Sequence, residues 1–162
     1  MSSSNSRAET GGVTAAPVAV DVDRMLLAAL AREGRASYTE LAEKVGLSVS
    51  AVHQRVRRLE QRGLITGYRA TLDPKLLGLP LTAFVSITPI GVQSEDPPAL
   101  LAHLPAIEEC HSVAGQESYI LKVRVPSPDA LEELLREIRA TAQVSTRTTV
   151  VLSTSYEGRP PV

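Results

Sequence analysis

The segment from Leu41 to Tyr68 constrains the fold most strongly, because two helical patterns in it are separated only by the short break "VGLS". Leu41 and Val45 are spaced to bury one face of the first helix, and Gly46 is placed to end it. The apolar positions of the second helix recur at intervals of three and four residues: Val49, Val52, Val56 and Leu59. Two short helices joined by a turn of about three residues that contains glycine predict a helix-turn-helix.

A preceding helix and two serine caps complete the predicted N-terminal module. The first helix is expected from about Asp23 to Arg32, with Gly34 as its stop. Ser37 and Glu40 have capping-box spacing, in which each side chain satisfies a free backbone N–H at the start of the second helix. Ser48 is placed to cap the third helix.

The side of the third helix away from the apolar stripe is rich in hydrogen-bonding and cationic groups: Ser50, His53, Gln54, Arg57, Arg58 and Gln61. A recognition helix reads base edges with its N-terminal half, so we expect Ser50, His53 and Gln54 to contact bases. Arg57 and Arg58 are placed further along, to reach guanine or phosphate. Four residues near the starts of helices two and three complete the predicted DNA-binding set: Ser37, Tyr38, Thr39 and Ser48.

The alternative interpretation of this helix is a small bundle with a solvated basic face. The segment that follows, "GLITGYRATL", favours DNA binding, because Gly63 stops the helix and Ile65 begins an extended strand that is suited to form a wing. Charge supports two modules with different partners. Residues 21–75 hold ten Lys and Arg against seven Asp and Glu (+3), whereas residues 76–162 hold six against ten (−4).

Composition excludes several classes of protein. The single cysteine, Cys110, excludes an internal disulfide and a cysteine-based zinc site, and it fits a reducing cytoplasm. No apolar run approaches the roughly 20 residues that a membrane helix needs. Residues 1–20 are rich in Ser, Ala, Thr and Gly and lack the pattern of a secretory signal, so we expect a disordered tail. We expect no metal site, no cofactor and no membrane partner.

The second half of the chain predicts a ferredoxin-like βαββαβ domain. A Pro- and Gly-containing linker over 73–80 separates it from the helix-turn-helix domain at 21–72, and the domain itself is expected over 81–157. The expected elements are strands and helices in this order: a strand over 81–90, a helix from Asp96 to Pro105, strands over 107–114 and 119–125, a helix after Ser127 and a strand over 144–154. This order is that of an α+β fold with both helices on one face of an antiparallel sheet.

The other sheet face is expected to carry apolar residues with no element left to cover it. Partner subunits are the natural cover, so we expect an oligomer; the alternative is a monomer with a half-exposed sheet. Catalysis is not expected. Cys110 and His111 are adjacent on a strand, so their side chains point to opposite faces and cannot form a nucleophile–base pair.

The chain resembles the Lrp/AsnC family, the feast/famine transcription regulators. The resemblance lies in "EGRASYTELAEKVGLSVSAVHQRVRRLEQRGLITGY" and in "IEECHSVAGQESYILKVRV", and it extends from about Val22 to Tyr156. It implies a cytoplasmic, nucleoid-associated homodimer that binds double-stranded, pseudo-palindromic DNA and often assembles into an octamer. It also implies that an amino-acid effector binds between C-terminal domains, and that the regulated genes serve amino-acid metabolism.

The effector site carries over only in part from this resemblance. Family members often have Gly-Asp-x-Asp-Tyr between the second and third strands, whereas here Gly115 and Tyr119 match and Gln116 and Ser118 replace the aspartates. Backbone N–H groups at a glycine turn suit a carboxylate, and a side-chain oxygen suits an ammonium. The predicted effector-binding residues are Ala114, Gly115, Gln116, Glu117, Ser118, Tyr119 and Thr148. An ordinary hairpin turn remains the alternative.

Two other functions stay open at this point. One is an architectural DNA-binding oligomer of the same fold that responds to no ligand. The other is a ligand-sensing or scaffolding oligomer whose DNA module has lost its function, against which the intact polar face of the third helix argues.

Overall fold

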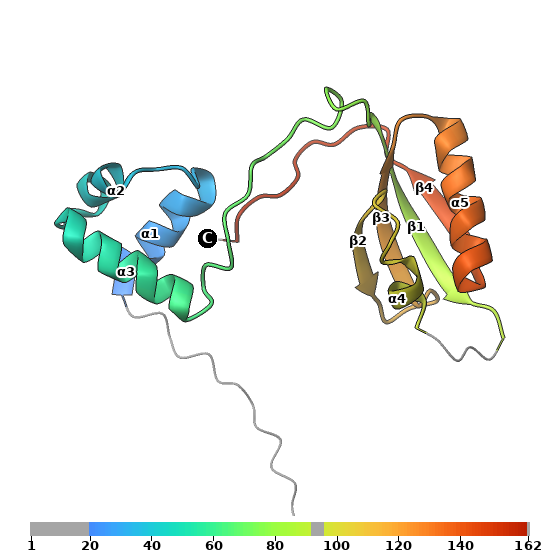
Figure 1. The fold of residues 1–162 in the computed structure, drawn as a ribbon, viewed down its shortest axis with the longest axis horizontal. Helices are drawn as coiled ribbons and strands as arrows, with labels where there is room; N and C mark the ends of the chain where they lie inside the picture. Colours follow the sequence, from blue (N-terminus) through green and yellow to red (C-terminus); the bar gives the residue numbers. More distant parts are fainter. Residues whose placement is uncertain (1–19, 92–95, 162) are drawn as a thin grey trace, which may run out of the picture. The chain divides into compact units, whose positions relative to one another are not determined.

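The computed structural model describes residues 20–91 and 96–161, which form two compact units (Figure 1). The first unit comprises residues up to Ala70 together with the C-terminal residues from Gly158, and the second is Thr71–Glu157. The predicted tail over 1–20 lies almost entirely outside the described residues. Within these two ranges, no helix is both long and apolar enough to cross a membrane.

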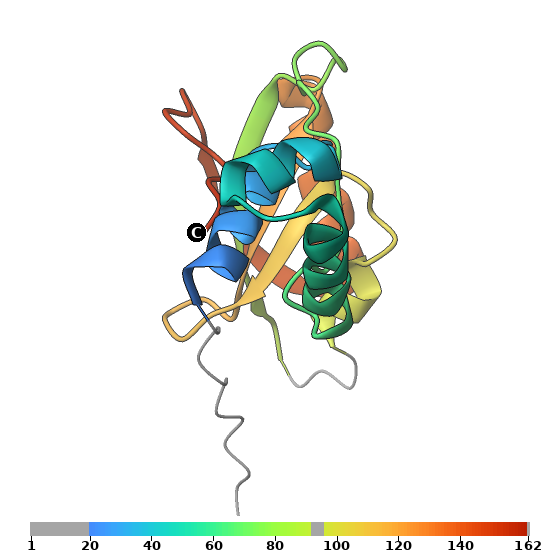
Figure 2. The ribbon, with the colours of Figure 1, turned by 90° about the vertical axis from the view of Figure 1, so that its left-hand side faces the viewer.

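Three helices pack around one core in the first unit (Figure 2). They are α1 (Val20–Arg32), α2 (Tyr38–Val45) and α3 (Val49–Gln61). Each contributes fully or almost fully buried side chains to this core: Leu26, Leu41, Ala42, Val52, Val56 and Leu59. The helical spacing seen in the sequence is therefore the spacing of residues that meet in the core.

The predicted caps are confirmed. The Ser37 backbone N–H donates to Glu40 Oε2 at 2.7 Å, and the Glu40 backbone N–H donates to Ser37 Oγ at 3.2 Å. The bond from the Ser37 backbone lowers the pKa of Glu40 because it stabilises the carboxylate. Gly46 ends α2 in the left-handed conformation (φ 68°), and Ser48 Oγ accepts from the Ala51 backbone N–H at the start of α3.

Two expectations for the first unit were wrong. Val49 is 45% exposed, because it is the first residue of α3 and packing against the other helices begins only at Val52. The strand expected from Ile65 is also missing. The Leu64 and Ile65 backbone N–H groups instead donate to Leu59 O and close the end of α3.

Tyr68 holds the segment after α3 against that helix without β-pairing. Its hydroxyl donates to Glu60 Oε1 at 2.9 Å. Burial and this bond to a carboxylate raise the pKa of Tyr68 to about 12. Within the described residues, no strand pairs with this segment. A side-chain bond fixes its path instead, and the chain therefore leaves α3 as an irregular segment.

The second unit is a four-stranded antiparallel sheet with two helices. Its elements are β1 (Leu81–Pro89), α4 (Pro97–Leu101), β2 (Ile107–Ser112), β3 (Tyr119–Val125), α5 (Pro128–Ala142) and β4 (Val144–Val150). The strand order β2-β3-β1-β4 is that of the predicted ferredoxin-like fold. Alternate β1 residues pack with both helices in one core: Ala83, Val85 and Ile87. Both helices therefore cover the same sheet face, with α5 lying along the strands in Figure 1.

Several elements are shorter than predicted. β4 ends at Val150, and one further backbone bond joins the next residue to β1, from the Val151 N–H to Thr82 O. β2 ends at Ser112 and α4 at Leu101. In the predicted linker over 73–80, the Leu77 and Leu79 backbone N–H groups donate to Asp73 O and Pro74 O, which makes a compact turn.

The sheet face away from the helices is mainly polar, which corrects the expected apolar face. Phe84 and Ile120 lie on it beside a charged cluster made of Lys122, Arg124, Glu108, Glu109 and Glu157. Lys122 is 8% exposed because these carboxylates and the C-terminal segment over 151–157, which we call the strap, surround it. A groove of about 530 Å³ separates the strap from β1 and β3.

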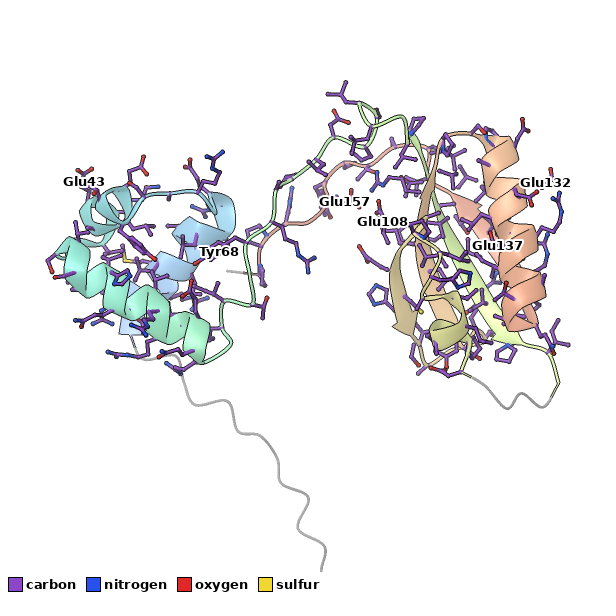
Figure 3. All side chains as sticks on the ribbon, in the orientation of Figure 1. Glu43, Tyr68, Glu108, Glu132, Glu137 and Glu157 are labelled. Atoms are coloured by element: carbon purple, nitrogen blue, oxygen red, sulfur yellow. The ribbon has the colours of Figure 1, made fainter. Side chains whose placement is uncertain are left out.

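Ion pairs attach the strap to the sheet through Glu157, which is labelled in Figure 3. Glu157 contacts Lys122 Nζ, and its Oε2 lies 3.4 Å from Arg124 Nη2. The bond from Lys122 lowers the pKa of Glu157. Although burial disfavours the ammonium, its bonds to Glu157 and Glu109 raise the pKa of Lys122. These ion pairs and the Val151–Thr82 backbone bond therefore hold the strap against the sheet.

Acid is expected to release the strap. The folded pKa of Glu157 lies below its usual 4.5, so its stabilising effect is present above pH 4.5 and is lost as pH falls through the folded value. Glu157→Gln should release the strap at neutral pH, measured as faster exchange of the Val151 amide hydrogen. The global cost should stay within about 1 kcal/mol because Glu157 is half-exposed. Glu132→Gln, which removes a partner of Arg136 on the surface of α5, is the matched control and should leave the amide unchanged.

Candidate functional site

The outward side of α3 presents a continuous set of polar side chains. Val52, Val56 and Leu59 are buried on the inner side of the helix. All the residues on the opposite side are exposed: Ser50, His53, Gln54, Arg57, Arg58 and Gln61. We call this side the reading face. Its exposure confirms the pattern predicted from the sequence, and it leaves these groups free to meet a partner.

One arginine of α3 does not belong to the reading face. Arg55 Nη1 lies 2.7 Å from Asp23 Oδ1 of α1, and the Asp23 side chain is 8% exposed. This pair links α3 to α1 across a partly buried contact. This pair was not predicted from the sequence. The available signal was Asp23 itself, an acidic residue one turn before the buried Leu26 on a helix that faces arginines.

Asp23→Asn is expected to destabilise the chain by about 1–3 kcal/mol. The substitution removes a charge-assisted hydrogen bond and leaves the partly buried Arg55 without its counter-charge. Urea unfolding of the full chain measures the loss. Glu43→Gln, which neutralises an exposed acid on α2, is the control and should change stability by less than about 0.5 kcal/mol. Equal effects of the two substitutions would show that the ion pair does not stabilise the domain.

The other predicted DNA contacts lie near the starts of α2 and α3. Ser37 Oγ accepts from the Glu40 backbone N–H and donates to Glu40 Oε2 at 2.8 Å. Ser48 Oγ accepts from the backbone of α3 and lies 3.2 Å from Ser50 Oγ. Both hydroxyls thus have capping roles before any DNA is present. Thr39 is exposed, and the Tyr38 ring packs edge-to-face against the His53 ring.

The predicted effector turn, 113–118, is tied to the neighbouring strand. The Val113 backbone N–H donates to Ser118 O, and the Ser118 backbone N–H donates to Ile87 O at the end of β1, both at 3.1 Å. Ala114, Gly115 and Gln116 are exposed at its tip. A Cβ on Gly115 would lie 3.8 Å from Glu117 Oε2, which is ordinary contact, so the fold itself does not require glycine here.

Glu117 and Tyr119 are each engaged with residues from other segments. The Glu117 side chain is 18% exposed and contacts the guanidinium of Arg147, which projects from β4 and is 67% exposed. The Tyr119 hydroxyl donates to Asp96 Oδ1 at 3.0 Å, and this bond raises the pKa of Tyr119. A carboxylate on the turn and a guanidinium on β4 are therefore in contact.

Thr148 does not share the sheet face of this ion pair. Arg147 is paired with Ser86 and Thr148 with Val85, so the two side chains point to opposite faces. Val85 is in the core beneath the helices, and Thr148 lies on that side. The structure thus brings Arg147, and not Thr148, to the turn. Arg147 was missed because its position depends on the register between β4 and β1.

Cys110 and His111 are separated as strand alternation predicts. Cys110 is paired with Leu121 and lines a pocket of about 220 Å³ with apolar residues of α4. Burial raises the pKa of the Cys110 thiol, which disfavours the reactive thiolate. His111 Nε2 lies 3.0 Å from Glu109 Oε2 on the other face. The bond with His111 lowers the pKa of Glu109.

Two families match the two units of the chain. Residues 21–66 match the winged helix-turn-helix DNA-binding family, and residues 82–161 match the Lrp/AsnC ligand binding domain. The first match includes the whole reading face. The second includes the turn, Arg147 and the strap.

Characterised relatives match both units together. The HTH-type transcriptional regulator LrpA of Mycobacterium tuberculosis is 54% identical over 140 residues, which cover 86% of this chain and 93% of the relative. The leucine-responsive regulatory protein of Escherichia coli (strain K12) is 42% identical over 136 residues, covering 81% of this chain and 83% of the relative.

Solved structures have the same fold. A feast or famine regulatory protein from Mycobacterium tuberculosis, complexed with L-methionine, has a TM-score of 0.83 at 54% identity, covering 86% of this chain and 95% of that one. A transcriptional regulator from Neisseria meningitidis, also complexed with L-methionine, has a TM-score of 0.81 at 25% identity, covering 85% of this chain and 92% of that one.

Proposed function

Because the chain belongs to the Lrp/AsnC family of transcriptional regulators, we propose that it is a sequence-specific DNA-binding regulator of amino-acid metabolism genes, modulated by an amino acid bound in its C-terminal unit. The observation that carries this proposal is the reading face. A helix whose apolar stripe is buried presents six exposed polar side chains on its other side, in a chain that also holds the family's ligand-binding domain.

In the proposed complex, α3 enters the major groove. Gln54 has the two-point geometry that pairs with adenine, and His53 and Ser50 lie beside it in the N-terminal half of the helix. Arg57 and Arg58 reach guanine or phosphate one turn further on, and Ser37, Tyr38, Thr39 and Ser48 contact the backbone. Phosphate contacts supply most of the affinity, while base contacts supply the discrimination between sequences.

The proposed effector is a small amino acid at the 113–118 turn. Support comes from the two relatives bound to L-methionine and from the charges at the turn. Glu117 offers an acceptor to an ammonium group, whereas exposed backbone N–H groups and the Arg147 guanidinium offer donors to a carboxylate. The assignment of Ala114, Gly115, Gln116, Ser118, Tyr119 and Thr148 to effector binding remains a prediction.

The proposed assembly is a homodimer that forms larger rings, up to an octamer, in the cytoplasm and on the nucleoid. One exposed apolar side chain on the otherwise mainly polar sheet face supports self-association: Phe84 is 42% exposed there. Exposed leucines on the 73–80 turn add further apolar surface within the same unit: Leu76 and Leu77. No catalytic step and no resident cofactor form part of the proposal.

Gel shifts over a salt series test the DNA-binding part of the proposal. The DNA is the region upstream of the protein's own gene. A regulator should retain a specific complex in excess competitor DNA, and its affinity should fall with a slope near −0.9 per phosphate contacted in log–log form. Weak binding to every sequence, without a preferred site, would favour an architectural protein. No binding to any DNA would indicate a scaffold without a working DNA module.

Thermal-shift measurements against the twenty amino acids test the effector half, followed by size-exclusion chromatography with the strongest ligand. A ligand that binds the folded form raises the melting temperature. We expect at least one amino acid to do so and to change the assembly size or the operator affinity. If none does, the ligand-independent alternative is preferred.

A further inference from the structure

An aromatic contact joins the two helices of the helix-turn-helix at the reading face. Tyr38 is the first residue of α2 and His53 lies in α3. Their ring centroids are 5.0 Å apart, and the ring planes are at 90°. Both values are typical of attractive edge-to-face aromatic pairs. His53 is therefore in contact with a second helix, although it lies on the exposed side of its own.

The capping box at the start of α2 fixes the backbone next to Tyr38. The residue before it, Ser37, is held by both bonds of the capping box with Glu40, so the backbone at the start of α2 is fixed. The Tyr38 side chain is still 39% exposed, which leaves its ring at the surface where it meets His53. Within the described residues, no comparable side-chain contact holds Gln54 or Arg57. In the described part of the chain, His53 thus has a side-chain contact with a second helix that Gln54 and Arg57 lack.

Order at this position matters for base discrimination. A neutral imidazole offers one donor and one acceptor nitrogen, and the major groove presents a different donor–acceptor pattern for each base pair. His53 remains exposed despite this contact, so part of its ring stays available to DNA. A side chain ordered before binding also loses less conformational freedom in the complex. The Tyr38 ring consequently limits the directions in which His53 can hydrogen-bond.

We infer that Tyr38 is a positioning residue for His53, and that its ring, not its hydroxyl, determines which base pair His53 accepts. This inference rests on the proposed function, since it requires α3 to lie in the major groove. It gives Tyr38 a different role from the backbone contact that the sequence predicted and that the proposed complex includes. The two residues then act as one specificity unit that spans both helices of the motif.

Selection of preferred sequences from a random DNA pool tests the inference with the full chain. The proteins are the wild type, Tyr38→Phe, Tyr38→Ala, His53→Ala and the double Tyr38→Ala/His53→Ala variant. We expect Tyr38→Ala and His53→Ala to lose preference at the same base-pair position, by about threefold to tenfold, and the double variant to lose no more. Tyr38→Phe, which keeps the ring, should retain the wild-type preference. Glu43→Ala, at an exposed position of α2 outside the proposed DNA contacts, is the matched control and should leave that position unchanged.

Distinct outcomes overturn the inference. If Tyr38→Phe and Tyr38→Ala weaken binding to all sequences equally, the hydroxyl contacts phosphate and Tyr38 does not position His53. If the two alanine variants change different base-pair positions, or if their effects add, the residues act independently. Should Tyr38→Ala fail to fold, Tyr38→Leu takes its place, because leucine keeps apolar bulk and removes the ring.

Failure of the proposed function looks different. A folded wild type that selects no preferred sequence contradicts sequence-specific regulation, and the inference fails with it. A wild type with a clear preferred sequence that Tyr38→Ala and Tyr38→Leu leave intact contradicts only the role of Tyr38.

Discussion

Replacing Gln54 and Arg57 together by alanine is expected to abolish specific operator binding while the oligomer stays intact. Both side chains are exposed on α3 and face away from its buried stripe, so their removal leaves the core unchanged. Each bidentate base contact contributes about 1–3 kcal/mol of discrimination. Losing two should weaken operator binding by roughly 30-fold or more. Gel shifts on the operator and on unrelated DNA, with size-exclusion chromatography, measure the two properties separately.

The salt dependence of the same variant distinguishes two roles for Arg57. If Arg57 reads guanine, the salt slope should stay close to that of the wild type. If it contacts phosphate, the slope should fall by about one unit. Arg32→Ala removes an exposed arginine of α1 that lies outside the reading face, and it is the control for the loss of charge. Unchanged operator affinity in the Gln54/Arg57 variant, or an equal loss in the control, would place the DNA-reading surface elsewhere.

Replacing Gly115 by leucine is expected to remove the response to amino acids while DNA binding survives. Gly115 is exposed, and a Cβ there meets only ordinary contact with Glu117 Oε2 at 3.8 Å, so the turn should still fold. The larger side chain then covers the backbone N–H groups and the Glu117 carboxylate that an effector needs. Loss of two such hydrogen bonds to charged groups weakens binding by about 100-fold or more.

Calorimetry with L-methionine, and then with the best ligand from the thermal-shift screen, measures this loss. Ala140→Leu adds the same side chain at an exposed position of α5 and is the control, which should bind the ligand normally. Gel shifts in the absence of ligand should be the same for both variants. Unaltered ligand uptake by Gly115→Leu would exclude the turn as the effector site.

The parts of the site that could be predicted from the sequence are those governed by neighbours along the chain. The Ser37–Glu40 capping box and the Ser48 cap involve residues three positions apart, and the structure has both. Helical spacing in α3 also separates buried Val52 and Val56 from exposed Gln54. One turn of helix contains all the information that such a prediction needs.

Predictions from local patterns were less accurate at the ends of helices and strands. Val49 fits the helical spacing but is exposed, because a stripe is buried only where another helix lies against it. The segment after Gly63 has the composition of a strand, yet it forms none, since a strand needs a partner and Tyr68 bonds to Glu60. Local composition does not indicate whether a partner strand is present.

Local patterns along the chain thus determined the helices, their caps, the order of the strands along the chain and the side of α3 that faces outward. Only the tertiary structure decided which charges meet. Asp23 pairs with Arg55, which is 32 residues away in the sequence. Glu117 pairs with Arg147 of β4, and Glu157 of the strap pairs with Lys122 of β3. The physical reason is that hydrophobic spacing and capping depend on near neighbours in the chain. A pairing between distant charges depends on sheet register and helix packing, which form only when the whole domain folds.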